Sequence, residues 1–210
     1  MFITLEGPDG SGKTTQAQLL AEWLRQEGYD VVLTREPGGT EIGEQVRAVL
    51  HNPCNTAMDA RAEILLYSAS RAQHVAQLIR PALVAGKIVI SDRYADSTLA
   101  YQGYGRGLDL EMLRAITAFA TGGLMPDLTL CLDIAPEAGL QRRRSGQGEW
   151  NRLDAETLEF HRRVRAGYLE LAGQEPTRWV IIDADRPPED VHAQIRSVVQ
   201  VRLGRSLRNT

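Results

Sequence analysis

The chain has little that would support disulfide bonds, a structural metal site or a membrane span. Only two cysteines occur, Cys54 and Cys131, without a C-x-x-C pair or metal-ligand spacing, so both are expected to be reduced thiols. No uninterrupted apolar run approaches the ~18 residues of a transmembrane helix, and no basic segment followed by a long apolar stretch stands at the N-terminus. We therefore expect a cytoplasmic protein with no membrane partner.

The chain also lacks an excess of positive charge. Its 24 Lys and Arg residues are outnumbered by 27 Asp and Glu residues, which gives a formal net charge of -3. Nothing in this balance attracts a polyanion, so nucleic acid is not an expected partner, and a phosphate ligand must be held by local donors and cations. The length of 210 residues and a hydrophobic content of 43% predict one globular domain, residues 1–210.

Short apolar runs alternate with amphipathic stretches, which is typical of a parallel sheet with helices on both faces. The predicted strands are Phe2–Glu6, Val31–Arg35, Ile88–Asp92, Leu128–Asp133 and Trp179–Asp183. Charged residues at strand ends would emerge at the carboxyl edge of the sheet, where open α/β sheets bind ligands. Helical spacing predicts a helix over Thr14–Gln26 and a long helical segment over residues 58–85, in which Pro81 should kink or restart the last turn.

A phosphate-binding motif stands between the first predicted strand and the first predicted helix. It satisfies G-x-x-x-x-G-K-[ST] and consists of Gly7, Pro8, Asp9, Gly10, Ser11, Gly12, Lys13 and Thr14. Glycines let successive backbone N–H groups face phosphate oxygens, the helix N-terminus adds its dipole, and Lys13 reaches the β- and γ-phosphates. Thr14 is the expected Mg²⁺ ligand, and Thr15 belongs to the same nucleotide site. The motif predicts a P-loop that binds a nucleoside triphosphate.

The rest of the chain favours a small-molecule kinase over a regulatory GTPase. A GTPase needs an Asn-Lys-x-Asp guanine reader after a late strand, and Asn151-Arg152-Leu153-Asp154 lacks the lysine and follows no strand. When the acceptor of a kinase is itself a phosphate, positioning and charge neutralisation can carry catalysis, and arginines suit this role through their bidentate fork. Arg35 ends the second predicted strand and Arg93 follows the third.

Four further motifs occur in order along the chain. They are Thr34-Arg35-Glu36-Pro37-Gly38-Gly39-Thr40, Ser91-Asp92-Arg93-Tyr94, Ala100-Tyr101-Gln102-Gly103 and Pro126-Asp127-Leu128-Thr129. Together with the P-loop they resemble the successive signatures of bacterial thymidylate kinases over nearly the whole chain. The resemblance implies an α/β, three-layer P-loop kinase fold with a five-stranded parallel sheet and a short lid. It further implies a homodimer formed through helix packing, ATP with Mg²⁺ as phosphoryl donor, and dTMP as acceptor.

The resemblance also implies roles on the acceptor side. Asp9 matches a carboxylate that reaches the deoxyribose 3′-hydroxyl and helps organise the metal site. Pro37 and Tyr67 match residues that pack on thymine, and Arg71 matches the side chain that hydrogen-bonds the base. A place for Tyr67 in the hydrophobic core is the alternative, because its helix is apolar. Gln102 is expected near the acceptor.

Two further matches concern the phosphate and the sugar. Asp92 and Arg93 come directly after the apolar run Ile88-Val89-Ile90-Ser91, so the carboxylate can face Mg²⁺ while the guanidinium faces the acceptor phosphate. Tyr101 matches a tyrosine that crowds the sugar 2′ position and so disfavours ribonucleotides. Arg35 is expected to contact the substrate.

Residues 142–153 are the predicted lid. The P-loop contains no arginine, so the lid is expected to supply the catalytic cation from Arg142, Arg143, Arg144 or Arg152. Asn151-Arg152-Leu153-Asp154 resembles the end of the lid in the thymidylate kinase family, which favours Arg152 as the catalytic cation. Arg144 is expected to contribute to donor binding. Gly146 and Gly148 make residues 144–151 resemble a mobile loop between two helices.

Two other functions stay open from the sequence. A deoxynucleoside kinase would use a carboxylate base near the P-loop, a role that Glu36 could fill, although Arg93 and the Pro37-Gly38-Gly39 context favour a phosphate acceptor. A non-catalytic nucleotide switch is the other alternative, because a P-loop can bind without transferring phosphate.

Overall fold

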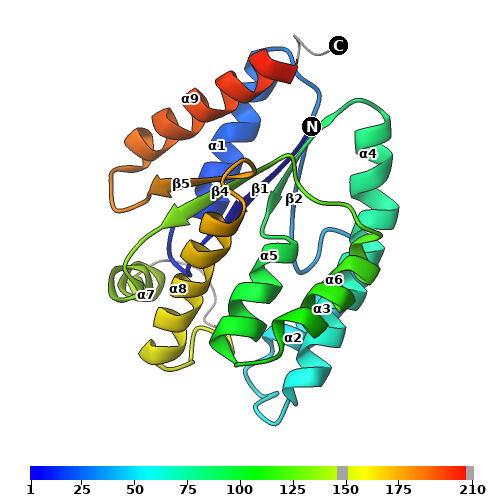
Figure 1. Cartoon of the computed structure of the whole chain (residues 1–210), viewed down its shortest axis with the longest axis vertical. Helices are drawn as coiled ribbons and strands as arrows, with labels where there is room; N and C mark the ends of the chain where they lie inside the picture. Colours follow the sequence, from blue (N-terminus) through cyan, green and yellow to red (C-terminus); the bar gives the residue numbers. More distant parts are fainter. Residues whose placement is uncertain (146–150, 207–210) are drawn as a thin grey trace.

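A five-stranded parallel sheet runs through the molecule. The computed structural model describes residues 1–145 and 151–206, and the strand order is β2-β3-β1-β4-β5 (Figure 1). The strands are β1 (Phe2–Glu6), β2 (Val31–Arg35), β3 (Ile88–Asp92), β4 (Leu128–Asp133) and β5 (Trp179–Asp183). The predicted strands and the predicted parallel sheet are confirmed.

Helices connect the strands. They are α1 (Lys13–Gln26), α2 (Glu41–His51), α3 (Ala60–His74), α4 (Arg80–Val84), α5 (Ala95–Thr98), α6 (Leu110–Thr121), α7 (Pro136–Ser145), α8 (Leu158–Gln174) and α9 (Pro188–Ser206). Two stretches wind as π-helices, η1 (Val75–Ile79) and η2 (Leu99–Gly105). The helix predicted over Thr14–Gln26 is confirmed, with its start one residue earlier.

The long helical segment predicted over residues 58–85 has three parts. α3 passes into η1 and then into α4, whose first turn contains Pro81. Proline has no N–H to donate, and its ring crowds the carbonyl four residues earlier, so a regular helix cannot continue unchanged through it. The wide turn of η1 precedes this break. The predicted restart at Pro81 is confirmed.

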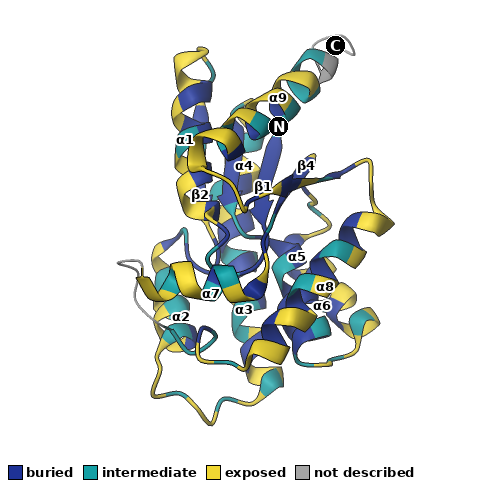
Figure 2. Ribbon diagram, turned by 90° about the vertical axis from the view of Figure 1, so that its left-hand side faces the viewer, coloured by how far each residue is buried: buried dark blue, intermediate teal, exposed yellow. Residues whose placement is uncertain are grey.

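Helices cover both faces of the sheet. On one face, α1 and α9 pack through residues such as Leu20 and Ile195. On the other face, α8 and η2 enclose a core that includes Tyr101 and Tyr168, while η1 and α4 close a smaller core around Phe2. Figure 1 shows these layers, and Figure 2 shows the buried strands between the helices. The predicted three-layer arrangement is therefore present.

Side chains of β1 alternate between these two faces. Ile3 and Leu5 belong to the core under α1, whereas Phe2 belongs to the core under α4. The same period of two places Glu6 on the face of Phe2, where it is fully buried and accepts a hydrogen bond from the Tyr168 hydroxyl of α8. A carboxylate is thus enclosed directly beside the P-loop.

Side-chain caps define where α2 and α3, two of the helices bordering the site, begin. Thr40 accepts a hydrogen bond from the backbone N–H of Gly43 at the start of α2, and Asp59 accepts one from Arg61 at the start of α3. Such caps satisfy N–H groups that have no partner within the helix.

The remaining sequence expectations concern membranes and thiols. Within the ranges that the structure describes, none of the helices combines the length and apolar character needed to cross a membrane. Cys54 is exposed and Cys131 is buried, and both are free thiols as predicted.

Candidate active site

The P-loop joins β1 to α1 at the carboxyl edge of the sheet. Lys13, in the first turn of α1, is buried and donates from Nζ to the carbonyl oxygen of Pro8 at 2.7 Å and to Ser11 Oγ at 3.2 Å. Burial, together with the positive charge of Arg93, lowers the pKa of Lys13 to about 8. An anion in the loop would favour the charged form of this lysine, because an opposite charge nearby stabilises it.

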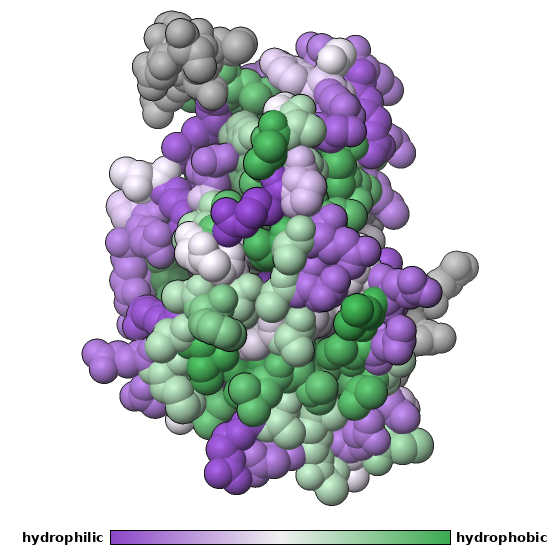
Figure 3. Space-filling model, turned by 90° about the vertical axis from the view of Figure 1, so that its right-hand side faces the viewer, coloured by the Kyte–Doolittle hydropathy of each residue, from purple (hydrophilic) through white to green (hydrophobic). Residues whose placement is uncertain are grey.

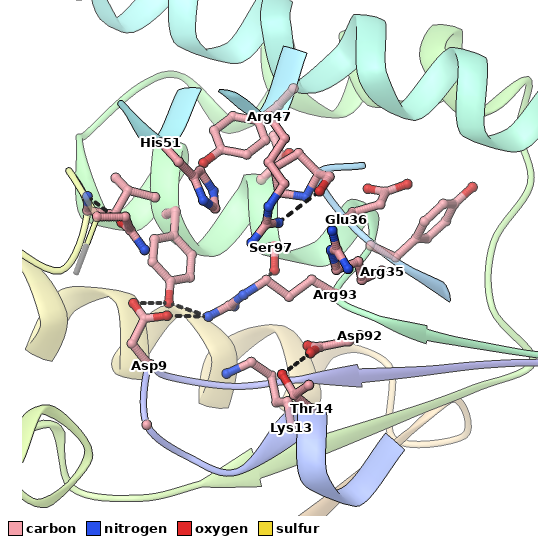
Figure 4. A pocket seen from close by; sticks show the side chains of 18 of the residues that line it. Asp9, Lys13, Thr14, Arg35, Glu36, Arg47, His51, Asp92, Arg93 and Ser97 are labelled. Carbon is pink, nitrogen blue, oxygen red and sulfur yellow. Dashed lines mark hydrogen bonds and ion pairs between the residues drawn. The ribbon is translucent and has the colours of Figure 1, made fainter. Parts of the chain in front are cut away.

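Thr14 and Asp92 form a pair of oxygen ligands beside the P-loop. The Thr14 hydroxyl donates to Asp92 Oδ2, although the two residues are 78 positions apart (Figure 4). Hydroxyl and carboxylate oxygens suit Mg²⁺, which keeps several waters and is usually completed by substrate phosphates. In the part of the chain that the structure describes, no three His, Cys, Asp or Glu side chains gather to hold a metal on their own. The pair therefore fits a magnesium ion that arrives with a nucleotide.

The P-loop backbone lies against the backbone of α7. A Cβ added at Gly10, where φ is +75°, would stand 1.9 Å from the Gly139 carbonyl oxygen. A Cβ added at Gly139 would stand 2.3 Å from the Asp9 carbonyl oxygen. Only glycine at both positions allows this approach.

Arg93, Asp9 and Tyr101 form one hydrogen-bonded group. Arg93 donates from Nη2 to Asp9 Oδ1 at 2.6 Å and to the Tyr101 hydroxyl at 2.9 Å, and Tyr101 donates to Asp9 Oδ2 at 2.7 Å (Figure 4). Burial alone would raise the pKa of Asp9, but the charges of Arg93 and Lys13 outweigh it and hold that pKa below its ordinary value. Arg93 has φ 70°, a left-handed conformation that is uncommon for a residue other than glycine.

A cavity of about 480 Å³ opens between this group and the helices α2, α3 and η2. It brings together most of the predicted site residues, which are Asp9, Gly10, Gly12, Lys13, Thr14, Thr15, Arg35, Pro37, Tyr67, Arg71, Asp92, Arg93, Tyr101 and Gln102. Gly7, Pro8 and Ser11 lie in the same loop but are not part of the wall of this cavity. Tyr67 is half-buried and faces the cavity, which argues against the alternative place in the hydrophobic core.

Arg71 is held rigidly by the protein. It is almost completely buried and donates from Nε to Glu36 Oε2 at 2.7 Å, from Nη1 to Thr98 Oγ1 at 2.9 Å and from Nη2 to the Tyr94 carbonyl at 3.1 Å. Glu36 also lies 3.0 Å from His74 Nδ1. Burial would raise the pKa of Glu36, but the charge of Arg71 and these hydrogen bonds hold it below its ordinary value.

Arg35 and Gln102 both line the cavity. Arg35 is half-exposed and donates to Glu44 Oε2 at 2.9 Å. Gln102, in η2, is buried and donates from Nε2 to Glu63 Oε1 at 2.8 Å. The carboxylate partner of each side chain was not expected from the sequence.

The wall of the cavity also contains residues that sequence reasoning missed. Arg47 and His51 both project from α2, and Arg47 donates to the Pro37 carbonyl at 2.9 Å. Burial and the charge of Arg47 lower the pKa of His51 to about 4, which keeps its imidazole neutral near pH 7. Their spacing of four residues on a helix was a detectable signal. Sequence reasoning also missed Glu6, which is buried beside the cavity wall and not part of it. Burial together with the charge of Asp96 raises the pKa of Glu6 to about 7.

The predicted lid begins inside a helix. Arg142, Arg143 and Arg144 occupy the last turn of α7. Arg143 faces the cavity and donates from Nε and Nη2 to the two carboxylate oxygens of Asp154, each at 3.0 Å, while Arg144 is exposed. Residues 146–150, which include Gly146 and Gly148 of the predicted mobile loop, lie outside the described residues.

Arg152 is not part of the wall of the larger cavity and is held by groups of α2 and α3. It donates from Nη2 to Glu63 Oε2 and from Nε to the Leu50 carbonyl at 3.3 Å. Glu63 also pairs with Arg106, whose Nε lies 2.7 Å from Glu63 Oε1. The structure thus gives Arg152 a buried carboxylate partner, and its catalytic role stays a prediction.

A second cavity of about 420 Å³ adjoins the outer side of the P-loop. Its wall comes from the P-loop, α1, α7, the segment after β5 and the first turn of α9, and contains Ser11, Gly12, Thr15, Gln16, Arg142, Ala184, Arg186, Pro187, Pro188 and Val191. Arg142 is fixed there by hydrogen bonds to the Ala184 carbonyl at 2.8 Å and to Asp185 at 3.1 Å. The two cavities share Gly12 and Thr15, so one nucleotide could extend from one to the other.

Comparison with known proteins gives concordant results. A family model described as thymidylate kinase matches residues 5–195. A thymidylate kinase from Synechococcus sp. is 57% identical over 204 residues, covering 97% of this chain and 97% of the relative, and one from Desulfovibrio desulfuricans is 51% identical over 215 residues, covering 98% and 97%. A crystal structure of thymidylate kinase from Ehrlichia chaffeensis superposes with a TM-score of 0.77 at 39% identity, covering 95% of this chain and 98% of that one.

Proposed function

Since this chain belongs to the thymidylate kinase family of ATP-dependent nucleoside monophosphate kinases, we infer from its geometry how it transfers the γ-phosphoryl group of ATP to dTMP. The products are ADP and dTDP, a step in dTTP synthesis. The similar proteins give no support to a deoxynucleoside kinase or to a non-catalytic switch.

One observation carries the assignment of substrates to sites. The larger cavity is lined at one end by Lys13 and Thr14 of the P-loop and at the other by Tyr67 and Arg71 of α3. We place the ATP phosphates on the P-loop and dTMP in the larger cavity, with its phosphate toward Arg93. The smaller cavity is then the site of the ATP base and ribose, beside Arg142.

Positioning and charge neutralisation account for the transfer. The acceptor phosphate is already ionised, so its oxygen can attack the γ-phosphorus without a general base while the bond to the β-γ bridging oxygen breaks. Lys13 would neutralise the β- and γ-phosphates, and Arg93 would hold the attacking phosphate. Asp9 would orient the acceptor sugar through its 3′-hydroxyl, and Tyr101 would crowd the 2′ position.

Thr14 and Asp92 would hold Mg²⁺ together with nucleotide phosphates and water. When bound, the ion neutralises negative charge on the phosphates. Removing the carboxylate by Asp92→Asn would leave the ion with a weaker ligand and raise the Mg²⁺ concentration needed for activity.

The base of dTMP would lie near Pro37 and Tyr67. Stacking on an aromatic ring gives affinity with little base specificity, so hydrogen bonds from Arg71 would supply the specificity. Gln102 would line the same end of the site, and Arg35 would contribute positive charge at its open side.

The catalytic cation of the lid is assigned to Arg152, with Arg143 as a second candidate because it already faces the larger cavity. Arg152 would have to leave Glu63 to reach the phosphates. Arg144 would contribute to binding the donor.

We also propose that residues 1–210 form one domain, that the protein acts in the cytoplasm, and that two copies form a homodimer through helices. Leu65 of α3, Val84 of α4 and Phe119 of α6 are large apolar side chains with exposed fractions of 59%, 85% and 90%. These helices lie on the right-hand side of the molecule in Figure 1. That side faces the viewer in Figure 3, which shows hydrophobic surface on it. Light scattering on Phe119→Glu and the parent would test this interface, since the charge should yield monomers.

A coupled assay of ADP release tests the function itself. With ATP and Mg²⁺ present, dTMP should produce rapid ADP release. Thymidine, which offers only hydroxyl acceptors, should not. Faster turnover with thymidine than with dTMP would refute a phosphate acceptor.

A further inference from the structure

Arg93 is held along two distinct edges of its guanidinium. The Nη2 edge contacts Asp9 and Tyr101, which line the larger cavity. The Nη1 edge contacts the framework of the protein: the Gly7 carbonyl at 3.1 Å, Ser97 Oγ at 3.2 Å and the Tyr168 hydroxyl at 3.0 Å. A ligand that replaces Asp9 on the first edge would leave the second edge unchanged.

Glu6 stands directly behind the second edge. Its Oε2 accepts hydrogen bonds from Ser97 Oγ at 2.6 Å and from the Tyr168 hydroxyl at 2.9 Å, the same two oxygens that accept from Arg93. A hydroxyl group has one proton. The two hydroxyl oxygens also lie 2.9 Å apart, so one of them could donate to the other instead. A hydroxyl that gives its proton to ionised Glu6 has only lone pairs left for Arg93, so the carboxylate favours this direction of the hydrogen bonds.

Glu6 also holds the backbone that follows Arg93. Its Oε1 accepts a hydrogen bond from the backbone N–H of Tyr94 at 2.8 Å. This contact constrains the peptide group directly after a residue with φ 70°. Glu6 therefore constrains both the main chain of Arg93 and one edge of its side chain, without contacting the guanidinium itself.

We propose that Glu6 is a positioning residue for Arg93, fixing one edge of the guanidinium so that the other can exchange Asp9 for the acceptor phosphate. The inference rests on the proposed role of Arg93 at that phosphate. In its ionised form Glu6 supplies a counter-charge behind the arginine, separated from it by the hydroxyl groups of Ser97 and Tyr168.

Glu6→Gln is the matched perturbation, since it keeps the size of the side chain. If the amide oxygen takes the place of Oε2, the amide N–H₂ faces the N–H of Tyr94, and two donors meet. If the amide nitrogen takes that place, at least one hydroxyl must reverse and point its proton at Arg93. Each orientation loses a contact that positions the arginine.

The experiment is steady-state kinetics with dTMP varied at saturating ATP and with ATP varied at saturating dTMP. For Glu6→Gln we expect kcat/KM for dTMP to fall about tenfold while KM for ATP changes less than about twofold. The double variant Ser97→Ala/Tyr168→Phe should reproduce the loss, because it removes both intervening hydroxyls and leaves the Tyr94 contact. This variant also serves if Glu6→Gln does not fold. Asp133→Asn is the control, since Asp133 is a partly buried carboxylate that pairs with Arg165 and has no hydrogen bond to Arg93 or Glu6.

A double-mutant cycle with Arg93→Ala separates the two assignments. If Glu6 acts through Arg93, adding Glu6→Gln to Arg93→Ala should lower kcat/KM for dTMP by less than about twofold further. Independent, multiplicative losses would overturn the inference, as would equal effects on ATP and dTMP. If Arg93→Ala reduces acceptor use but Glu6→Gln and the hydroxyl variant do not, only the role of Glu6 is wrong. If Arg93→Ala itself leaves acceptor kinetics unchanged, the proposed function of Arg93 is wrong, and the inference is overturned with it.

Discussion

Replacing Glu36 by glutamine removes one charge from a buried ion pair. The side chains of Glu36 and Arg71 are 3% and 2% exposed, and their atoms lie 2.7 Å apart. Removing one partner of a buried pair typically costs about 3–5 kcal/mol, because the remaining charge is left uncompensated. Glutamine can still accept one hydrogen bond, so we expect the lower end, about 3 kcal/mol. For a chain of this length the loss corresponds to a fall in Tm of about 6–12 °C.

The pH dependence of this loss has a definite sign. The pKa of Glu36 is held below its ordinary value in the folded protein, so its stabilisation is complete above the pKa of the unfolded chain, about 4.3. The stabilisation is lost as pH falls toward the folded value. The difference in unfolding free energy between the parent and Glu36→Gln should therefore shrink below about pH 4.3.

Urea unfolding of both proteins at pH 7 and at lower pH measures these quantities. Glu44→Gln is the matched control, because Glu44 pairs with Arg35 at 2.9 Å but both side chains are about half exposed. It should cost less than about 1 kcal/mol. The reasoning would be refuted if the two variants lost equal stability, or if the loss in Glu36→Gln did not diminish on acidification.

Three further predictions concern activity. Lys13→Ala should keep the thermal unfolding curve of the parent but lose most phosphoryl transfer, because the cation on the phosphates is gone; near-normal turnover in a folded variant would contradict its role. Replacing Tyr101 by a small residue should narrow the preference for deoxyribose over ribose monophosphates, since the proposed discrimination is steric; an unchanged ratio of kcat/KM values would count against it. Arg152→Ala should lower kcat by up to about 10³-fold with little change in acceptor binding, whereas the same change at Arg143 tests the second candidate. Unaltered kcat in both variants would exclude these two residues as the catalytic cation.

The sheet and the phosphate site were predictable because they depend on local patterns. Each strand is a short apolar run, and all five predicted strands have the observed bounds. The carboxyl ends of parallel strands meet at one edge, so Thr14 and Asp92 could be placed together from their positions after β1 and at the end of β3. The meeting of Asp9 with Arg93 follows from the same edge.

The partners chosen by the arginines could not be predicted in this way. Arg71 pairs with Glu36 and Arg152 with Glu63 across 35 and 89 positions of sequence, and these choices depend on how side chains pack between elements. Nor does the sequence pattern reveal η2, since a π-helix differs from an α-helix by one residue per hydrogen-bonded turn. Tyr101 and Gln102 lie in that stretch, so their direction is set by tertiary packing.

The backbone contact between Gly10 and Gly139 couples the movement of the P-loop to that of α7. Their backbones touch without intervening side chains, so neither can slide across the other by a change of rotamer. The start of α7 must move with the P-loop when the P-loop changes conformation. The three arginines in the last turn of α7 can move independently of the P-loop only if the helix bends after Gly139. A conformational change that brings those arginines toward bound phosphate must therefore bend α7 beyond Gly139 or move the P-loop together with the helix.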